Sequence, residues 1–185
     1  MAEIFFISDT HFGHKNFLNF TDKDGKKIRP FDTVEEMDET MIANWNKKVP
    51  VVGAKIYHLG DVTFRPKNFA GIACRLNGNN HMRLIPGNHD DIMDPLLMKW
   101  FEKASIWRIF KDFGFVCTHI PIPHDQFRHK VKFNVHGHVH TNDQVKADGT
   151  LDQRYINLCV EKHDYTPVHV DEIAAMMKER KFWID

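Results

Sequence analysis

The chain has 185 residues, a length that fits one domain with a real core, and 42% of its residues are hydrophobic. Lys plus Arg and Asp plus Glu both number 25, so a zero formal charge excludes a global field that would hold long nucleic acid. No apolar run reaches membrane-spanning length and no charged leader precedes the first apolar segment, so we expect one cytoplasmic domain over residues 1–185 and no membrane partner.

The three cysteines are Cys74, Cys117 and Cys159, an odd number of residues that lie far apart. Each lies within an otherwise apolar stretch. We therefore expect buried, reduced thiols and no disulfide framework, as in a reducing compartment.

The first half of the chain alternates strands with helices. Residues 4–7 are predicted to form a strand, and residues 22–25 a tight turn at the tip of a small hairpin, in which Gly25 supplies the positive φ. Thr33 and Glu36 form a capping box at the start of an amphipathic helix over residues 33–48. A strand is expected at residues 56–59, a helix from Pro66 to about residue 78, and a strand at residues 82–85.

The second half is richer in strands. A helix is expected from Pro95 to about Lys103, followed by an antiparallel pair over residues 107–111 and 115–118. Further strands are expected at residues 131–135 and 155–160, and a closing helix over residues 170–181. Strand-helix units followed by hairpin-connected strands indicate an α/β protein with two layers of sheet and helices outside.

Five short polar motifs follow predicted strands in a fixed order: Asp9-Thr10-His11, Gly60-Asp61, Gly87-Asn88-His89-Asp90, His119 and Gly137-His138-Val139-His140. Ligands of open α/β sheets collect where the carboxyl ends of strands converge. In an extended segment residues i and i+2 face the same side, so the first and last motifs each form a two-pronged clamp. Any one motif alone is an ordinary turn or surface sequence, but together they predict a site for two metal ions.

The other eight of the 13 histidines are interpreted as structural or surface residues. Among them only His14, His124 and His136 lie close enough in sequence to a motif to be suspected of a role in the site.

From Ile4 to His140 the order of the motifs resembles that of the calcineurin-like metallophosphoesterase superfamily. Within the superfamily, the chain most resembles the small bacterial and phage members. Four segments carry this resemblance: residues 8–14, Arg29-Pro30-Phe31, Asn44-Trp45-Asn46 and His58-Leu59-Gly60-Asp61. The resemblance implies the metallo-dependent phosphatase fold, a four-layer αββα sandwich of two mixed sheets flanked by helices, with a dinuclear site at the strand ends.

The resemblance also implies which residues hold each metal. Asp9, His11 and His140 would hold one divalent ion, Asn88, His119 and His138 would hold the other, and Asp61 would bridge them. A hydroxide between the ions would attack phosphorus in line. Manganese is the first expectation, and iron, nickel, cobalt, zinc or magnesium would also suit these ligands.

His89 would act as general acid and protonate the leaving oxygen, the alternative being a buried structural histidine. Related protein phosphatases place an aspartate, which orients this histidine, where the chain has Phe64. Asp90 or another carboxylate would have to substitute. Arg65 lies at the same distance after the Gly-Asp motif as an arginine of the family. Its guanidinium could bind a phosphate or could simply be exposed to solvent, and the sequence supports both interpretations equally.

Two further segments border the motifs. Residues 23–29 carry Lys23, Lys26, Lys27 and Arg29, which we interpret as a solvated turn in preference to a substrate-facing patch. Residues 120–124 contain two prolines after His119 and are expected to form a stiff loop that shapes one wall of a substrate pocket.

The leading hypothesis is a metal-dependent phosphoric ester hydrolase, a phosphodiesterase or phosphatase, acting on a phosphorylated small molecule or nucleotide. One alternative is a nuclease acting on DNA or RNA, which the zero net charge disfavours. The other is a non-catalytic scaffold with the same fold. The presence of His89 and of every expected ligand favours the enzyme. The sequence does not define the substrate, the native metals or the oligomeric state.

Overall fold

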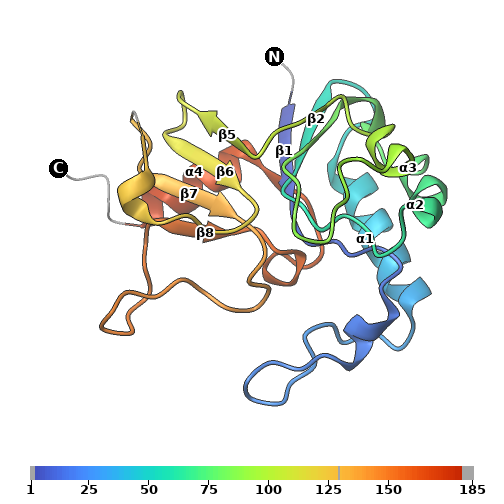
Figure 1. The fold of residues 1–185 in the computed structure, drawn as a ribbon, viewed down its shortest axis with the longest axis horizontal. Helices are drawn as coiled ribbons and strands as arrows, with labels where there is room; N and C mark the ends of the chain where they lie inside the picture. The colour runs from blue at the N-terminus through green and yellow to red at the C-terminus, as the bar shows by residue number, and fades with distance from the viewer. Residues whose placement is uncertain (1–2, 129, 181–185) are drawn as a thin grey trace.

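Two β-sheets carry the fold, as seen in a computed structural model that describes residues 3–128 and 130–180 (Figure 1). The first sheet has the strand order β4-β3-β2-β1-β9. Its strands are β1 (Glu3–Ile7), β2 (Ala54–His58), β3 (Met82–Leu84), β4 (Lys103–Ala104) and β9 (Val168–His169). Strands β1 to β4 run parallel, and β9 is antiparallel to β1, so this sheet is mixed.

The second sheet has the order β5-β6-β7-β8. Its strands are β5 (Trp107–Phe110), β6 (Phe115–Thr118), β7 (Phe133–His136) and β8 (Tyr155–Asn157). β5 is antiparallel to β6, while β6, β7 and β8 run parallel. The antiparallel pair expected from the sequence is confirmed, and so is the α/β class with two mixed sheets.

The described residues form four α-helices, α1 (Val34–Lys48), α2 (Pro66–Ala73), α3 (Pro95–Met98) and α4 (Val170–Glu179). Short 3-10 turns lie between the longer elements: η1 (Lys15–Asn19), η2 (Asn79–His81), η3 (His124–Gln126) and η4 (Val160–Lys162). Every helix within residues 3–128 and 130–180 is too short or too polar to span a lipid bilayer.

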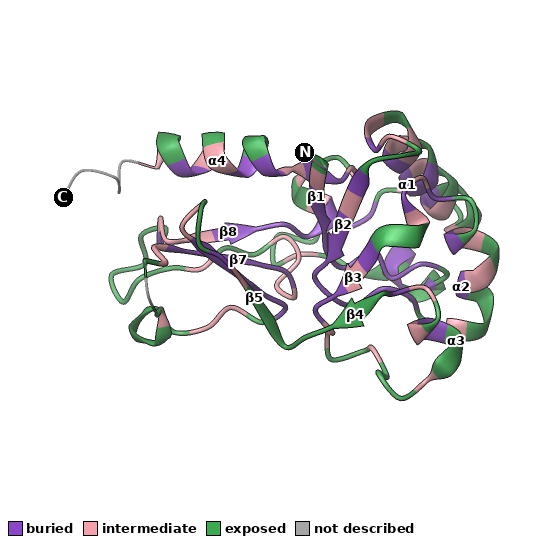
Figure 2. Cartoon of the chain, turned by 90° about the horizontal axis from the view of Figure 1, so that it is seen from above, coloured by how far each residue is buried: buried purple, intermediate pink, exposed green. Residues whose placement is uncertain are grey.

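Strand β1 shows how the layers are built, because successive side chains of a strand point to opposite faces. Phe5 and Ile7 pack into a core shared with α1, α2 and α3, whereas Phe6 packs into a second core between the two sheets. That second core also receives Ile173 and Met177 from α4. Helices α1 to α3 therefore cover one face of the first sheet, and α4 lies on the side of the second sheet (Figure 2).

Helix α1 begins as the sequence predicts. The Thr33 hydroxyl accepts a hydrogen bond from Glu36 N at 3.1 Å, which satisfies a free amide of the first turn. The Glu36 carboxylate accepts from Asp32 N, one residue before the expected partner of a capping box. The hairpin turn before this helix is confirmed as well, with Gly25 at φ 78° and an antiparallel bridge between Thr21 and Lys27.

Several sequence predictions differ from the structure in their extent, among them the following four. The helix expected from Pro95 to Lys103 ends at Met98, because Lys103 pairs with Arg83 in strand β4. Helix α2 ends at Ala73, before residue 78. Strand β8 ends at Asn157, because Cys159 and the residues after it turn into η4. Helix α4 ends at Glu179, and Lys181 lies outside the described residues.

The cysteine prediction holds for two of the three residues. Cys117 and Cys159 are buried, but Cys74 is exposed at the end of α2, and all three are free thiols. Cys74 follows Ala73, the last buried residue of a short helix, and precedes exposed Arg75, so its side chain lies on the solvent side of the helix end.

Candidate metal centre

The predicted motifs meet at one end of the two sheets. Asp9 and His11 follow β1, Asp61 follows β2, and Asn88 follows β3, while His119 follows β6 and His138 and His140 follow β7. The strands concerned in each sheet run parallel, so their carboxyl ends share an edge. The two sheets thus contribute ligand-type side chains to a single location.

The backbone at this edge leaves the extended conformation abruptly. Asp9, His11, Asp61, His138 and His140 all have left-handed backbones with φ between 46° and 73°. The amides of Asp9 and His11 still pair with the segment that follows β2, since Asp9 N donates to Gly60 O and His11 N donates to Asp61 O, each at 2.9 Å. This left-handed geometry turns the side chains out of the strand direction and toward one another.

Two glycines of the motifs are required by close approach. A Cβ atom at Gly87 would lie 2.1 Å from Asp61 Oδ1, and one at Gly137 would lie 2.2 Å from Asp9 Oδ2. Any side chain would displace a carboxylate of the centre. These glycines therefore let the loops after β3 and β7 close onto the aspartates that follow β1 and β2.

The first cluster combines Asp9, His11 and His140. Asp9 Oδ1 lies 3.9 Å from Nε2 of His11 and 3.9 Å from Nε2 of His140. The other oxygen, Oδ2, is occupied by hydrogen bonds from the Ser8 hydroxyl, His138 N and the Cys159 thiol. Asp9 is thus held with one oxygen saturated and one directed at two imidazoles.

The second cluster combines Asn88, His119 and His138 with Asp61. His119 Nδ1 donates to the Leu59 carbonyl at 2.7 Å, so in the neutral ring Nε2 carries the lone pair. That Nε2 lies 3.1 Å from Asn88 Oδ1 and 3.6 Å from Asp61 Oδ2. Asp61, His119 and His138 also offer ligand atoms within 4.8 Å of one another.

Asp61 lies between the two clusters. Its Oδ2 is 3.4 Å from His11 Nε2 on one side and 3.6 Å from His119 Nε2 on the other. Its Oδ1 accepts from His89 N at 2.9 Å. Burial raises the pKa of Asp61, although His119 and the His89 amide oppose the shift. A carboxylate that is desolvated and flanked by lone pairs is suited to a cation.

Some ligand-type atoms of the two clusters are buried and lack a hydrogen-bond partner, as expected of atoms that bind metal ions. Asp9 Oδ1 and His11 Nε2 are buried and have no hydrogen-bond partner among the described residues. Burial, followed by Arg29, lowers the pKa of His11 far below its usual range, and burial with His119 lowers that of His138. Neutral imidazoles beside carboxylates are the mixed nitrogen and oxygen ligands of divalent transition metals.

The structure adds residues that the sequence analysis missed. Glu161 accepts from His140 Nδ1 at 3.1 Å and pairs with Arg29 at 2.7 Å. Despite burial, Arg29 and His140 lower the pKa of Glu161 to about 2, and in spite of its own burial the bond to Glu161 raises that of His140. A carboxylate behind a metal-ligating histidine fixes which ring nitrogen faces the metal.

Arg29 corrects one expectation for residues 23–29. Its side chain is fully buried and donates to the carbonyl oxygens of Asp9 and Thr10. It is therefore neither a solvated cation nor a substrate contact, and it holds the backbone of the first motif in place. Lys23, Lys26 and Lys27 are exposed, as a solvated turn requires.

Cys159 is the other residue the sequence did not assign to the site. Its thiol donates to Asp9 Oδ2 at 3.2 Å, and Asp9, His140 and Cys159 form a further group of potential ligands. Burial and then Asp9 raise the pKa of the thiol well above its usual value. No local pattern could have indicated this, because Cys159 reaches Asp9 through the pairing of Ser8 with Cys159.

His89 lies beside the first cluster and is exposed, which contradicts the alternative of a buried structural histidine. Its ring centroid is 5.3 Å from that of His11. Together with His11 and His140 it lines a pocket of about 610 Å³, whose other wall includes Phe17 and Phe20.

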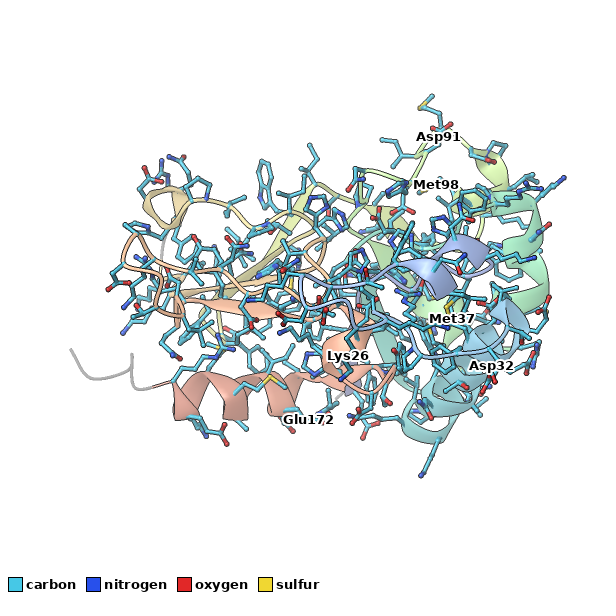
Figure 3. All side chains as sticks on the ribbon, turned by 90° about the horizontal axis from the view of Figure 1, so that it is seen from below. Lys26, Asp32, Met37, Asp91, Met98 and Glu172 are labelled. Atoms are coloured by element: carbon cyan, nitrogen blue, oxygen red, sulfur yellow. The ribbon has the colours of Figure 1, made fainter. Side chains whose placement is uncertain are left out.

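Asp90 does not orient His89. Both of its oxygens accept from backbone amides, namely those of Asp61, Val62 and Gly87. Asp91 projects from the molecular surface and accepts from Met93 N (Figure 3). The expectation of a substitute carboxylate is therefore wrong for Asp90, whose role is to hold the Gly60-Asp61 and Gly87-Asn88 loops together.

Phe64 packs against a histidine of the first motif's loop. It stacks on His14, with ring centroids 4.3 Å apart and an interplanar angle of 6°. Arg65 is exposed next to it, with its guanidinium 5.7 Å from the centroid of the Phe64 ring. His14 thus lies at the pocket wall, while Arg65 lies outside both clusters of candidate ligands.

A groove of about 450 Å³ opens on the other side of the centre. Asn88 and His119 lie at one end, and Trp107, Ile120 and Ile122 supply apolar walls. The loop after His119 therefore borders the site as the sequence predicts. His124 lies in η3 and lines neither this groove nor the 610 Å³ pocket, and buried His136 lies behind the centre.

These features define a mixed α/β protein of two sheets with residue groups that could hold metal ions. The uncharacterized protein MJ1445 of Methanocaldococcus jannaschii is 33% identical over 189 residues, which cover 98% of this chain and 94% of that protein. The chain belongs to the same family as this archaeal protein. No family model matches it.

Two solved structures are similar. The protein of unknown function AQ665 from Aquifex aeolicus has a TM-score of 0.71 and 26% identity, over 95% of this chain and 100% of that chain. The two chains therefore share one fold. A predicted phosphoesterase from Streptococcus pneumoniae has a TM-score of 0.36 and 12% identity, over 85% of this chain and 71% of that chain, a likeness too low to bear on function.

Proposed function

We propose that the chain is a dinuclear-metal-dependent phosphoesterase of the calcineurin-like metallophosphoesterase superfamily, with the αββα fold of that group in a single domain. The observation that carries the proposal is the convergence of ligands. Six side chains from four separate motifs form two adjacent clusters that share Asp61. Asn88 from a fifth motif faces His119 of the second cluster. In the first cluster, Asp9 Oδ1 and His11 Nε2 are buried and have no hydrogen-bond partner among the described residues.

In this proposal Asp9, His11 and His140 hold one metal, Asn88, His119 and His138 hold the other, and Asp61 contacts both. Bound divalent ions would supply a water of lowered pKa and neutralise charge on a phosphate. Four cationic charges against two carboxylates leave the centre positive, which suits an anionic phosphate ester.

His89 is the proposed catalytic acid. Its amide is fixed by Asp61, while its exposed ring borders the 610 Å³ pocket. Hydrolysis forms a bond from phosphorus to a water oxygen and breaks the bond to the leaving oxygen, which takes a proton from the His89 imidazolium. Because no described carboxylate holds the His89 ring, its position depends on packing beside His11.

The test compares His89→Ala with wild type in the manganese-loaded protein. The variant should keep both metals and lose on the order of a hundred- to ten-thousand-fold in rate on alkyl phosphate esters. Nitrophenyl esters should lose much less, because nitrophenolate departs without protonation. His81→Ala, which removes an exposed histidine paired with Glu102, is the matched control and should keep full activity.

Three outcomes contradict the proposal. Loss of metal in His89→Ala would make this residue a ligand, and equal damage to both types of ester would make it a phosphate contact. A wild-type protein that binds two metals yet hydrolyses no phosphate ester would be a non-catalytic scaffold.

A further inference from the structure

The groove beside the second cluster has an unusual lining. It is apolar along Ile106, Trp107, Ile120 and Ile122 and ends at Asn88 and His119. Ile106, Trp107 and Ile120 are 74%, 58% and 52% exposed. Three large apolar side chains gathered at one polar site mark a binding surface more often than a single exposed residue does.

The groove is a built surface. In the pairing of β5 with β6, Trp107 lies opposite Thr118, the residue before His119, and all three residues line the groove. The opposite wall is held by Ile122, whose amide donates to buried Asn134 and whose carbonyl accepts from the Tyr155 hydroxyl. Two hydrogen bonds therefore hold the backbone of the Ile122 wall.

The position of His89 distinguishes the pocket from the groove on the other side of the centre. His89 lines the 610 Å³ pocket together with His11 and His140, and it does not line the groove. An acid must stand next to the oxygen that leaves. The leaving group of a substrate therefore lies on the pocket side, and a substituent that stays on phosphorus is left to the Trp107 side.

The chemistry of the groove selects the retained substituent. No aspartate, glutamate, lysine or arginine is among its described lining residues, so it offers nothing to a further phosphate along a nucleic-acid backbone. A tryptophan face beside three isoleucines suits a neutral planar ring, which gains by stacking on an aromatic side chain.

We infer that the substrate is a phosphate diester that carries a planar aromatic group on the retained side, and that Trp107 is the residue that selects it. The inference rests on the proposed function and assigns its substrate class. A nucleoside is one group of this kind.

The experiment uses two diesters that share p-nitrophenolate as leaving group, methyl p-nitrophenyl phosphate and phenyl p-nitrophenyl phosphate, with the manganese-loaded full chain. Wild type should show a KM roughly tenfold lower for the phenyl diester, the size expected of one stacking contact. Trp107→Ala should abolish this preference and leave the KM for the methyl diester within about twofold. Trp107→Phe should keep most of the preference.

Val52→Ala is the matched control, because it truncates another exposed apolar residue before β2, at the end of that strand opposite to the site. It should leave both KM values unchanged. A second measurement does not depend on turnover. Phenylphosphonate, whose P–C bond is not hydrolysed, should quench the tryptophan fluorescence of wild type more than methylphosphonate does, and Trp107→Phe should remove the difference.

Failure of the inference is separable from failure of the proposed function. If both diesters are hydrolysed and Trp107→Ala affects them equally, Trp107 does not select the ring. If neither diester is hydrolysed although both metals are bound, the proposed function fails. If wild type sediments as a dimer that Trp107→Ala dissociates, the groove is covered by a second copy of the chain and the inference is wrong.

Discussion

Arg29 and Glu161 support the candidate centre from behind. Both are buried, they lie 2.7 Å apart, and Glu161 also holds His140. A buried ion pair adds little net stability compared with apolar residues. The loss of one partner, however, leaves the other charge buried with neither a counter-ion nor water. The energetic role of this pair therefore appears only when it is broken.

We predict that Glu161→Gln lowers the free energy of unfolding by about 3 kcal/mol, because Arg29 becomes an unpaired buried cation. Without the carboxylate the pKa of His140 should also fall, since Glu161 is what raises it. Urea unfolding measures the first effect, and NMR titration of the metal-free protein measures the second.

Glu39→Gln is the matched control, because Glu39 and Arg75 form a fully exposed pair of the same chemical type. Solvent screens such pairs, so its urea midpoint should stay close to that of wild type. Equal losses in both variants would mean that burial of the Arg29 pair has no energetic consequence.

The residue scale also shows what sequence could and could not provide. The seven candidate ligands could be predicted from the sequence, because each follows a recognisable apolar strand in a known motif order. Glu161 is separated from Arg29 by 132 positions, and no local pattern connects them. Asp90 was misassigned because its hydrogen bonds to the loops after β2 and β3 depend on how those loops approach each other.

At the scale of elements, helix α1 is tied to the loop that follows β1. Both oxygens of Asp38 on α1 accept from Gly13 N, at 3.1 and 3.0 Å, two residues after His11. Burial raises the pKa of Asp38 from its ordinary value of 3.8 to about 6, although the Gly13 bond and Arg29 oppose this. The folded protein thus binds a proton more tightly at Asp38 than the unfolded chain does.

Because the pKa of Asp38 is raised in the folded state, protonated Asp38 contributes its full stabilisation of the fold below pH 3.8. This contribution is lost as the pH rises through about 6. We predict that Asp38→Asn removes this loss and gains about 1 to 2 kcal/mol relative to wild type between pH 4 and pH 7, after solvent screening. Denaturant unfolding at a series of pH values measures it. A wild-type to variant difference that stays constant with pH would contradict the assignment.

Element boundaries were predictable where local chemistry sets them. Thr33 begins α1 because its hydroxyl satisfies the Glu36 amide, which the sequence alone indicates. The end of α3 is different, since Lys103 joins β4 by pairing with β3 across the sheet, and helical periodicity could not exclude that pairing. Helix caps can therefore be predicted from neighbouring residues in the sequence, whereas the pairing of strands that are distant in the sequence cannot.

At the scale of the whole molecule, the centre joins the two sheets. Asp9, Asp61 and Asn88 follow strands of the first sheet, whereas His119 and His138 follow strands of the second. Ions bound between them would bind only the folded chain, so they must stabilise it.

We predict that manganese at a hundredfold excess over its dissociation constant adds about 2.7 kcal/mol, equivalent to roughly 5 to 10 °C in Tm for a chain of this size. Elemental analysis should approach two ions per chain. The shift should shrink as the pH falls, because protonated imidazoles do not bind metal. Differential scanning calorimetry with and without chelator measures it.

His138→Gln should lower the shift by removing a ligand of the second cluster, whereas His81→Gln, which changes an exposed histidine beside Glu102, should leave it intact. A shift of equal size in both variants would place the bound metal elsewhere.

The left-handed backbone of the centre has a consequence for how the chain can change. Five side chains with ligand atoms adopt a conformation that costs a non-glycine residue of the order of 1 kcal/mol each, and together this rivals the net stability of a small protein. Glycine at any of these positions would relax the backbone and delete a ligand. At these five positions stability and the number of candidate ligands therefore oppose each other, so that a glycine substitution is expected to leave the metal-free chain sturdier and the centre one ligand poorer.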